Sequence, residues 1–136
     1  MIDMFAAFAV ALLLGGMVFF AAVMAPLVFT QLPAEQAGRF IRAVFPFYYL
    51  YVFATAAVGS MALAWDHPLA AIALAAIAAA TVWLRQGLMQ RINMLSDAAQ
   101  AGDGLARARF DRAHRLSVFV NAAQIIAAAW SLVQLT

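Results

Sequence analysis

The chain has 136 residues, of which 68% are hydrophobic and only 10% are charged. A soluble domain is about half apolar and about a quarter charged, so this composition excludes an ordinary soluble protein and favours a chain dissolved in a bilayer. The net charge of +2 comes from arginine alone, and the absence of cysteine excludes disulfides and thiolate chemistry.

Four long apolar runs predict an all-α integral membrane bundle of four transmembrane helices. A membrane-spanning helix needs about 20 apolar residues, and each run is close to that length. We do not expect a cleaved signal peptide, because Met4–Ala34 is uncharged for longer than the roughly 7–15 residues of a signal core. We predict one transmembrane domain, 1–136, with spans at about 4–31, 45–65, 69–85 and 116–135.

The connection between the first two spans has the pattern of a short amphipathic helix. Pro33 suits a helix start, and Glu35 and Arg39 stand four residues apart in the favourable order for an ion pair. Ala37 and Ile41 lie on the opposite face. We therefore predict a helix over Pro33–Val44 that lies at the membrane surface or against the bundle.

The connection between the third and fourth spans predicts a long helical hairpin over residues 86–115. The third span continues as a helix to about Ala101, where Gly102, Asp103 and Gly104 interrupt it. Asp103 is a good N-cap for the helix that follows. That helix has no breaker before the fourth span, so the hairpin tip is expected to project beyond the bilayer.

Orientation follows from the arginines, which all lie in these two connections or at their edges. Positive residues are retained on the cytoplasmic side of multi-pass proteins. We therefore expect both basic connections in the cytoplasm and both termini outside, in the inner membrane if the protein is bacterial. Because the arginines flank apolar runs, the expected partner is the lipid bilayer and not nucleic acid.

Polar residues gather in the half of the bundle nearest the arginines. His114, Ser117 and Asn121 recur at helical spacing on one face of the last helix, and Arg85 and Gln86 stand at a matching depth on the third span. One interpretation is a ligand-binding cavity that these five residues line and that opens to the cytoplasm. The other is a set of hydrogen bonds between helices, each contributing about 0.6 kcal/mol.

Small residues predict how the helices pack, because lipid gives helices no hydrophobic reason to associate. Gly15 and Gly16 should let a neighbouring helix approach closely. The same faces are candidates for contact with a second copy or with a membrane partner protein. On the first span the small residues form one stripe: Ala7, Ala11, Gly15, Ala22 and Ala25.

Three functions are compatible with these observations. The favoured one is a non-catalytic scaffold or accessory membrane subunit. The alternatives are a small transporter or channel-like module for a solute or metal, and a haem or redox enzyme. We predict no catalytic residues, metal ligands or cofactor. Haem in particular is not expected, because the two histidines, His67 and His114, should lie at opposite membrane faces and cannot serve one haem.

A resemblance to a known family rests on the order of several short motifs. In the first half they are Gly16–Phe20, Ala25-Pro26, Phe29, Leu32, Ala37-Gly38 and Phe45–Tyr49. In the second half they are Arg91–Asn93, followed by Phe110, His114, Ser117 and Asn121. With these motifs the chain resembles the family of uncharacterised membrane proteins that includes transmembrane protein 205. The resemblance implies a four-helix integral membrane protein and supplies no mechanism.

Overall fold

The computed structural model describes the backbone of residues 1–136 and every side chain except that of Ile2. The chain described is helical throughout and contains no strand. Its elements, in order, are α1 (Ile2–Phe19), the π-helix η1 (Phe20–Met24), α2 (Ala25–Gln31), α3 (Ala34–Leu63), α4 (Pro68–Trp83), the π-helix η2 (Leu84–Leu88), α5 (Met89–Gln100) and α6 (Gly104–Val133).

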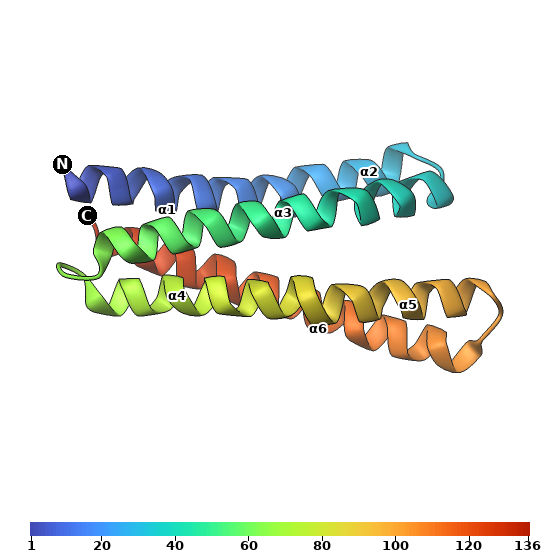
Figure 1. Cartoon of the computed structure of the whole chain (residues 1–136). Helices are drawn as coiled ribbons and strands as arrows, with labels where there is room; N and C mark the ends of the chain where they lie inside the picture. The colour runs from blue at the N-terminus through green and yellow to red at the C-terminus, as the bar shows by residue number, and fades with distance from the viewer.

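These elements form four helical rods, because α1, η1 and α2 run on without a break, as do α4, η2 and α5. The rods make two hairpins, α1–α3 and α4–α6, which lie side by side (Figure 1). Each rod is long and apolar enough to cross a bilayer, which supports a multi-pass membrane protein. At about 1.5 Å per residue, α3 is about 45 Å long and exceeds a hydrocarbon core of about 30 Å.

Both termini and the α3–α4 turn lie at one end of the molecule, and the other two connections lie at the opposite end (Figure 1). We call these the terminal end and the arginine end. We take the arginine end to include everything from the two π-helical turns outward, and it then contains all eight arginines, of which Arg85 of η2 is the innermost, together with four of the six acids. The two remaining acids, Asp3 and Asp66, stand at the terminal end. Charge is thus divided along the bundle as the sequence indicates.

The predicted amphipathic helix is not a separate element, which corrects the expected break before Phe45. Its residues form the first turns of α3, which continues through Pro46 to Leu63. The predicted face does pack against the bundle, since Ala37 and Ile41 are buried against Val28 of α2. Burial of this face outweighs the hydrogen bond that Pro46 removes from the helix.

The predicted hairpin tip is confirmed. Asp103 Oδ1 accepts hydrogen bonds from the backbone N–H groups of Leu105 and Ala106, both at 3.1 Å, and so caps α6. Gly102 has φ of 100°, a conformation that side chains with a Cβ rarely adopt. The ion pair between Glu35 and Arg39 also forms, at 3.1 Å.

Two π-helical turns interrupt the rods near the middle of the bundle. In η1, the backbone N–H of Ala25 bonds to the carbonyl of Phe20, five residues back. The turn directly precedes Pro26, which has no N–H to offer the preceding turn, so a widened turn here has a local cause. The second, η2, contains Gly87 and no proline.

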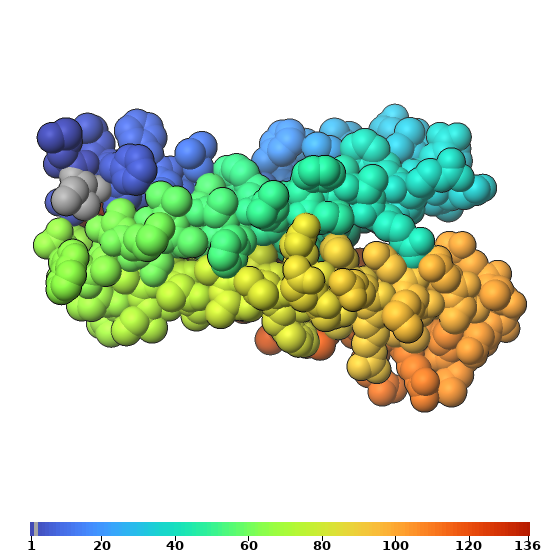
Figure 2. Space-filling view, in the orientation of Figure 1, coloured from blue at the N-terminus to red at the C-terminus, as the bar shows by residue number. Residues whose placement is uncertain are grey.

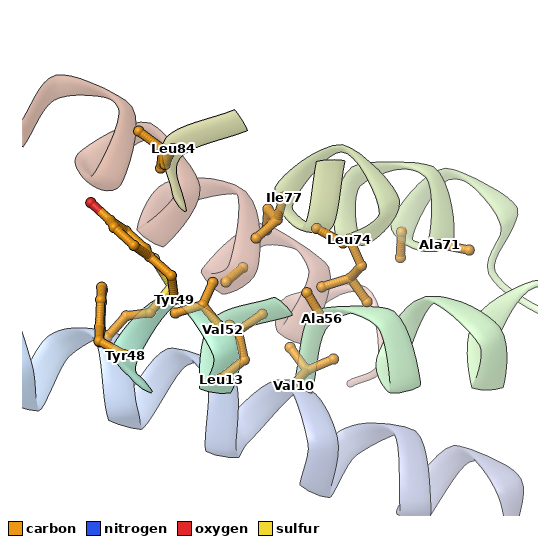
Figure 3. Close-up of a cluster of buried hydrophobic side chains, with 14 of the residues drawn as sticks. Val10, Leu13, Tyr48, Tyr49, Val52, Ala56, Ala71, Leu74, Ile77 and Leu84 are labelled. Atoms are coloured by element: carbon orange, nitrogen blue, oxygen red, sulfur yellow. The ribbon is translucent and has the colours of Figure 1, made fainter. Parts of the chain in front are cut away.

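The core that joins the hairpins is apolar and tightly packed (Figure 3). On α1 it is formed by Ala6, Val10, Leu13 and Met17, all fully buried. The predicted seam is therefore wrong for Ala11, Gly15 and Ala22, which are exposed. Larger α1 side chains fill the contact because the small residues stand on the facing helix, α3, at Ala56 and Gly59.

Gly16 does provide the predicted close approach. The ring of Tyr51 on α3 lies over it, so closely that a Cβ at Gly16 would stand 2.4 Å from Tyr51 Cε1. The Tyr51 hydroxyl donates a hydrogen bond to the carbonyl of Leu12, which fixes the ring in this position. A Cβ at the neighbouring Gly15 would have nothing within 4 Å.

We predict that Gly16→Ala lowers stability relative to Gly15→Ala. The added methyl must displace the Tyr51 ring and its hydrogen bond to Leu12, and overpacking of this kind costs about 1–3 kcal/mol. The measurement is thermal unfolding of both variants in the same detergent. Because the two positions are adjacent and gain the same helix propensity, equal melting temperatures would contradict the Tyr51 contact.

Candidate functional site

A groove lies between the two hairpins at the arginine end, and we call it the arginine-end groove. It consists of two adjoining cavities of about 220 and 160 Å³. Figure 2 shows the α3–α5 side of this region, where the start of α3 and the α5–α6 hairpin diverge. Both cavities are lined by Phe29, Ile41, Phe45, Tyr49, His114 and Ser117.

Arg42 bridges the two hairpins where they diverge. Its Nη2 donates to Asp97 Oδ1 at 2.9 Å and to the carbonyl of Asn93 at 2.7 Å, and so ties α3 to α5. Both bonds leave from the same nitrogen, and within the described structure Nε and Nη1 donate to no protein acceptor. One flank of the groove is therefore closed by a side chain that keeps donors to spare.

Three of the five predicted site residues line the groove together. His114, Ser117 and Asn121 stand on one face of α6, as their spacing predicts, and form one wall. The His114 ring stacks on Phe110 at a centroid distance of 5.9 Å. The Ser117 hydroxyl donates to the carbonyl of His114 at 2.7 Å.

Asn121 makes the interhelical hydrogen bond that the second interpretation of the polar residues expects. Its Oδ1 accepts from the Tyr48 hydroxyl of α3 at 2.7 Å. This bond lies at the deep end of the groove, where Phe20 of η1 stacks on the Tyr48 ring at 4.3 Å. Asn121 therefore has a structural partner as well as a place in the groove wall.

Arg85 and Gln86 do not join that wall. They line a separate cavity of about 100 Å³, and Tyr49 stands between it and the groove because its side chain lines both. Arg85 Nε donates to the carbonyl of Pro46 at 3.4 Å, so this arginine ties η2 to α3. The five predicted residues are thus divided between two cavities, and their role in binding a ligand stays a prediction.

An aromatic layer forms the floor of the groove, and sequence reasoning had not assigned it to the site. Phe45 and Tyr49 stack at 5.4 Å, and Phe20 lies edge-on to Phe45 at the same distance. Figure 3 shows the rings of Tyr48 and Tyr49 leaving α3 in different directions. The signal available in the sequence was the two adjacent tyrosines, which stand at the depth of Asn121.

Several polar groups of the groove, each able to donate a hydrogen bond, have no partner within the described structure. Within the described structure, the Tyr49 hydroxyl, the Ser96 hydroxyl, the Asn93 amide and the His114 ring make no hydrogen bond. Tyr49 is only 6% exposed as a whole residue, but its hydroxyl is not a buried unpaired group, because every buried side-chain nitrogen or oxygen among the described side chains has a hydrogen-bond partner. None of the lining residues is acidic.

The terminal half of the bundle is closed by packing. Gln124 of α6 donates to Thr81 Oγ1 at 3.0 Å and to the carbonyl of Ile77 at 3.2 Å, and all three are buried. A wider hollow of about 950 Å³ lies at this end between α1 and α3, lined by Phe8, Trp65 and other apolar residues. Lipid tails would cover such a surface, so we do not regard it as the site.

No three His, Asp or Glu side chains form a metal-binding group in the part of the chain whose side chains are described. The two histidines lie at opposite ends of the bundle, since His67 precedes α4 at the terminal end and His114 lines the groove.

Comparison with protein families matches residues 8–101 to a domain of unknown function, DUF4149. No curated protein and no solved structure matches the chain. The match includes most of α1 and all of α3, α4 and α5, whereas the α6 wall lies beyond it. The finer resemblance to the family of transmembrane protein 205 remains a prediction.

We predict that Tyr48 and Asn121 stabilise each other across the helices. In the double-mutant cycle of Tyr48→Phe and Asn121→Ala, the coupling energy should be about 0.6 kcal/mol and at most about 1.7 kcal/mol, as for hydrogen bonds in membrane proteins. The measurement is reversible unfolding in a mixed detergent. Strictly additive effects would mean that the hydrogen bond contributes nothing to stability.

Proposed function

The chain belongs to the DUF4149 family, whose description names no activity, and we propose from its geometry that it is a non-catalytic accessory membrane protein that holds a small ligand in the arginine-end groove. The observation that carries this proposal is a cavity whose lining combines apolar side chains with Arg42, Asn93, Ser96 and His114, placed between two hairpins that pack closely elsewhere. Ligand pockets are typically concave, mostly apolar and furnished with a few converging polar groups, and the arginine-end groove has this character.

Packing in the terminal half favours binding over passage. Ala6, Leu63, Ala128 and Ser131 are fully buried there, and the Gln124–Thr81 contact lies between them and the groove. A transporter or channel needs a route from one membrane face to the other, and a packed half offers none without a large rearrangement. The transporter is therefore the weaker alternative on this geometry.

We further propose that the groove opens on the cytoplasmic side. The arginine end holds every arginine of the chain, and positively charged connections are retained in the cytoplasm during insertion. Both termini would then face outward. A reporter enzyme that is active only outside the cytoplasm should be active when it is fused at Thr136. Activity of a reporter that works only in the cytoplasm would overturn this orientation.

The groove is tested by filling it. Ala21 lines the groove and the adjacent Ala22 does not, although both belong to η1 and both are exposed. We predict that native mass spectrometry of protein released from its own membrane finds a bound small molecule, which Ala21→Trp removes and Ala22→Trp retains. Because the control carries the same bulk one residue away, loss of the ligand in both variants would indicate general damage.

Two results would contradict the proposal. One is the absence of any bound molecule from the parent protein. The other is equal retention by the two tryptophan variants, which would place the molecule outside the groove.

A scaffold role without a ligand remains a second candidate, because one observation favours it. The small-residue stripe that the bundle leaves exposed on α1, at Ala11, Gly15 and Ala22, would admit a second helix at close range. On this proposal, Gly15→Leu should abolish a partner or second copy that co-purifies in mild detergent. Leu12→Ala changes size on the same exposed surface and serves as the control. A lone monomer from the parent would contradict it.

A further inference from the structure

We propose that the ligand of the arginine-end groove is an anionic phospholipid of the surrounding leaflet. Its phosphate would accept hydrogen bonds from the donors near Arg42, and one acyl chain would lie between α2 and α6. This inference rests on the proposed function, since it names the class of molecule that the same groove holds.

The deeper of the two cavities has the surface that an acyl chain requires. Its own lining, apart from the residues shared with the other cavity, is largely apolar and includes Phe20, Ala21, Ala25 and Val118. The polar groups there, Tyr48 and Asn121, bond to each other and so present little unsatisfied polarity to a chain.

The groove can be entered sideways from the bilayer. Its rim on α2 includes Phe29, and its rim on α6 includes Val118, both more than half exposed. In this region α2 packs on α3, whereas α6 packs on α5 and η2, so the two rims are not held together by packing. A lipid chain could therefore enter between them without passing through water.

The shallower cavity has the groups that a phosphate requires. Arg42 keeps Nε and Nη1 free, and the Ser96 hydroxyl, the Asn93 amide and the His114 ring add further donors. Charge-assisted hydrogen bonds from a guanidinium to phosphate oxygens are strong, and with Nη2 engaged Arg42 can donate a single bond from Nε or from Nη1. No carboxylate lines the cavity, and the neighbouring carboxylate of Asp97 is paired with Arg42.

The order of the two cavities along the bundle matches the order of head and chain in a leaflet. The donor-rich cavity lies toward the arginine end, with Arg42 and Asn93, and the apolar cavity lies deeper, with Phe20 and Asn121. The arginine end as a whole carries eight arginines against four acids, which attracts anionic headgroups before they bind. A free phosphate would leave the apolar cavity empty, and a zwitterionic lipid such as phosphatidylcholine would bring a choline cation next to the positive charge of the arginine end.

The experiment measures lipid binding to the full chain in detergent by native mass spectrometry. Probes are phosphatidylglycerol and phosphatidylcholine with identical chains, together with glycerol 3-phosphate as the head alone and palmitate as a chain with a carboxylate. We expect phosphatidylglycerol to bind at least several-fold more tightly than phosphatidylcholine, and both single-part probes to bind more weakly than phosphatidylglycerol.

Three variants locate the head. Arg42→Gln should weaken phosphatidylglycerol binding about tenfold, the loss expected for a hydrogen bond to a charged group. The matched control is Arg39→Gln, an exposed arginine of the same helix that pairs with Glu35 and does not line the groove. Should Arg42→Gln unfold, His114→Phe keeps the stacking on Phe110, removes the ring N–H groups and should also weaken binding.

The outcomes separate this inference from the proposed function. Equal affinities for the two phospholipids, or an equal loss in Arg39→Gln and Arg42→Gln, would overturn the anionic lipid. If Ala21→Trp still displaces some other bound molecule, the groove remains a ligand site of a different class. If Ala21→Trp displaces nothing, the proposed function fails as well.

Discussion

The contact of Arg42 with Asp97 and the Asn93 carbonyl sets the spacing of the two hairpins at the end where apolar packing no longer joins them. Arg42 and Asp97 are 42% and 63% exposed, and ion pairs of that exposure contribute about 0–1 kcal/mol. The contact therefore determines geometry more than stability. It closes the α3–α5 flank and leaves the α2–α6 flank open, and this difference gives the groove its lateral entrance.

Stability comes from the opposite half of the bundle, where small residues of α3 admit the larger side chains of α1. Val10 and Leu13 are fully buried there, and Gly59 allows Val10 and Leu74 to approach on either side. Gln124 adds a buried polar contact that fixes α6 against α4. A bundle that is closed at one half and separated at the other can hold a ligand at one face while remaining sealed at the other.

The helices and their ends were largely predictable from the sequence because each depends on local chemistry. Hydrocarbon-length apolar runs predicted the four rods, and Asp103 with its two glycines predicted the hairpin tip. The start of α3 was predicted wrongly, because its polar composition predicted a break before Phe45. In the structure the helix continues without a break, since Ala37 and Ile41 are buried against Val28. The packing face of α1 was predicted wrongly for a related reason. Small residues show where two helices can approach closely, but the shape of the facing helix decides which face of α1 is used.

The site was predictable only in part because helical spacing reports faces within one helix and not distances between helices. His114, Ser117 and Asn121 share a face of α6 and so form one wall as predicted. Arg85 was placed with them by depth alone, and Tyr49 separates it from them. Tyr49 lines the groove on one side and the Arg85 cavity on the other, so depth in the membrane and membership of a site are independent. The aromatic layer decides which side chains line the groove, and the only trace of this layer in the sequence is the pair of adjacent tyrosines.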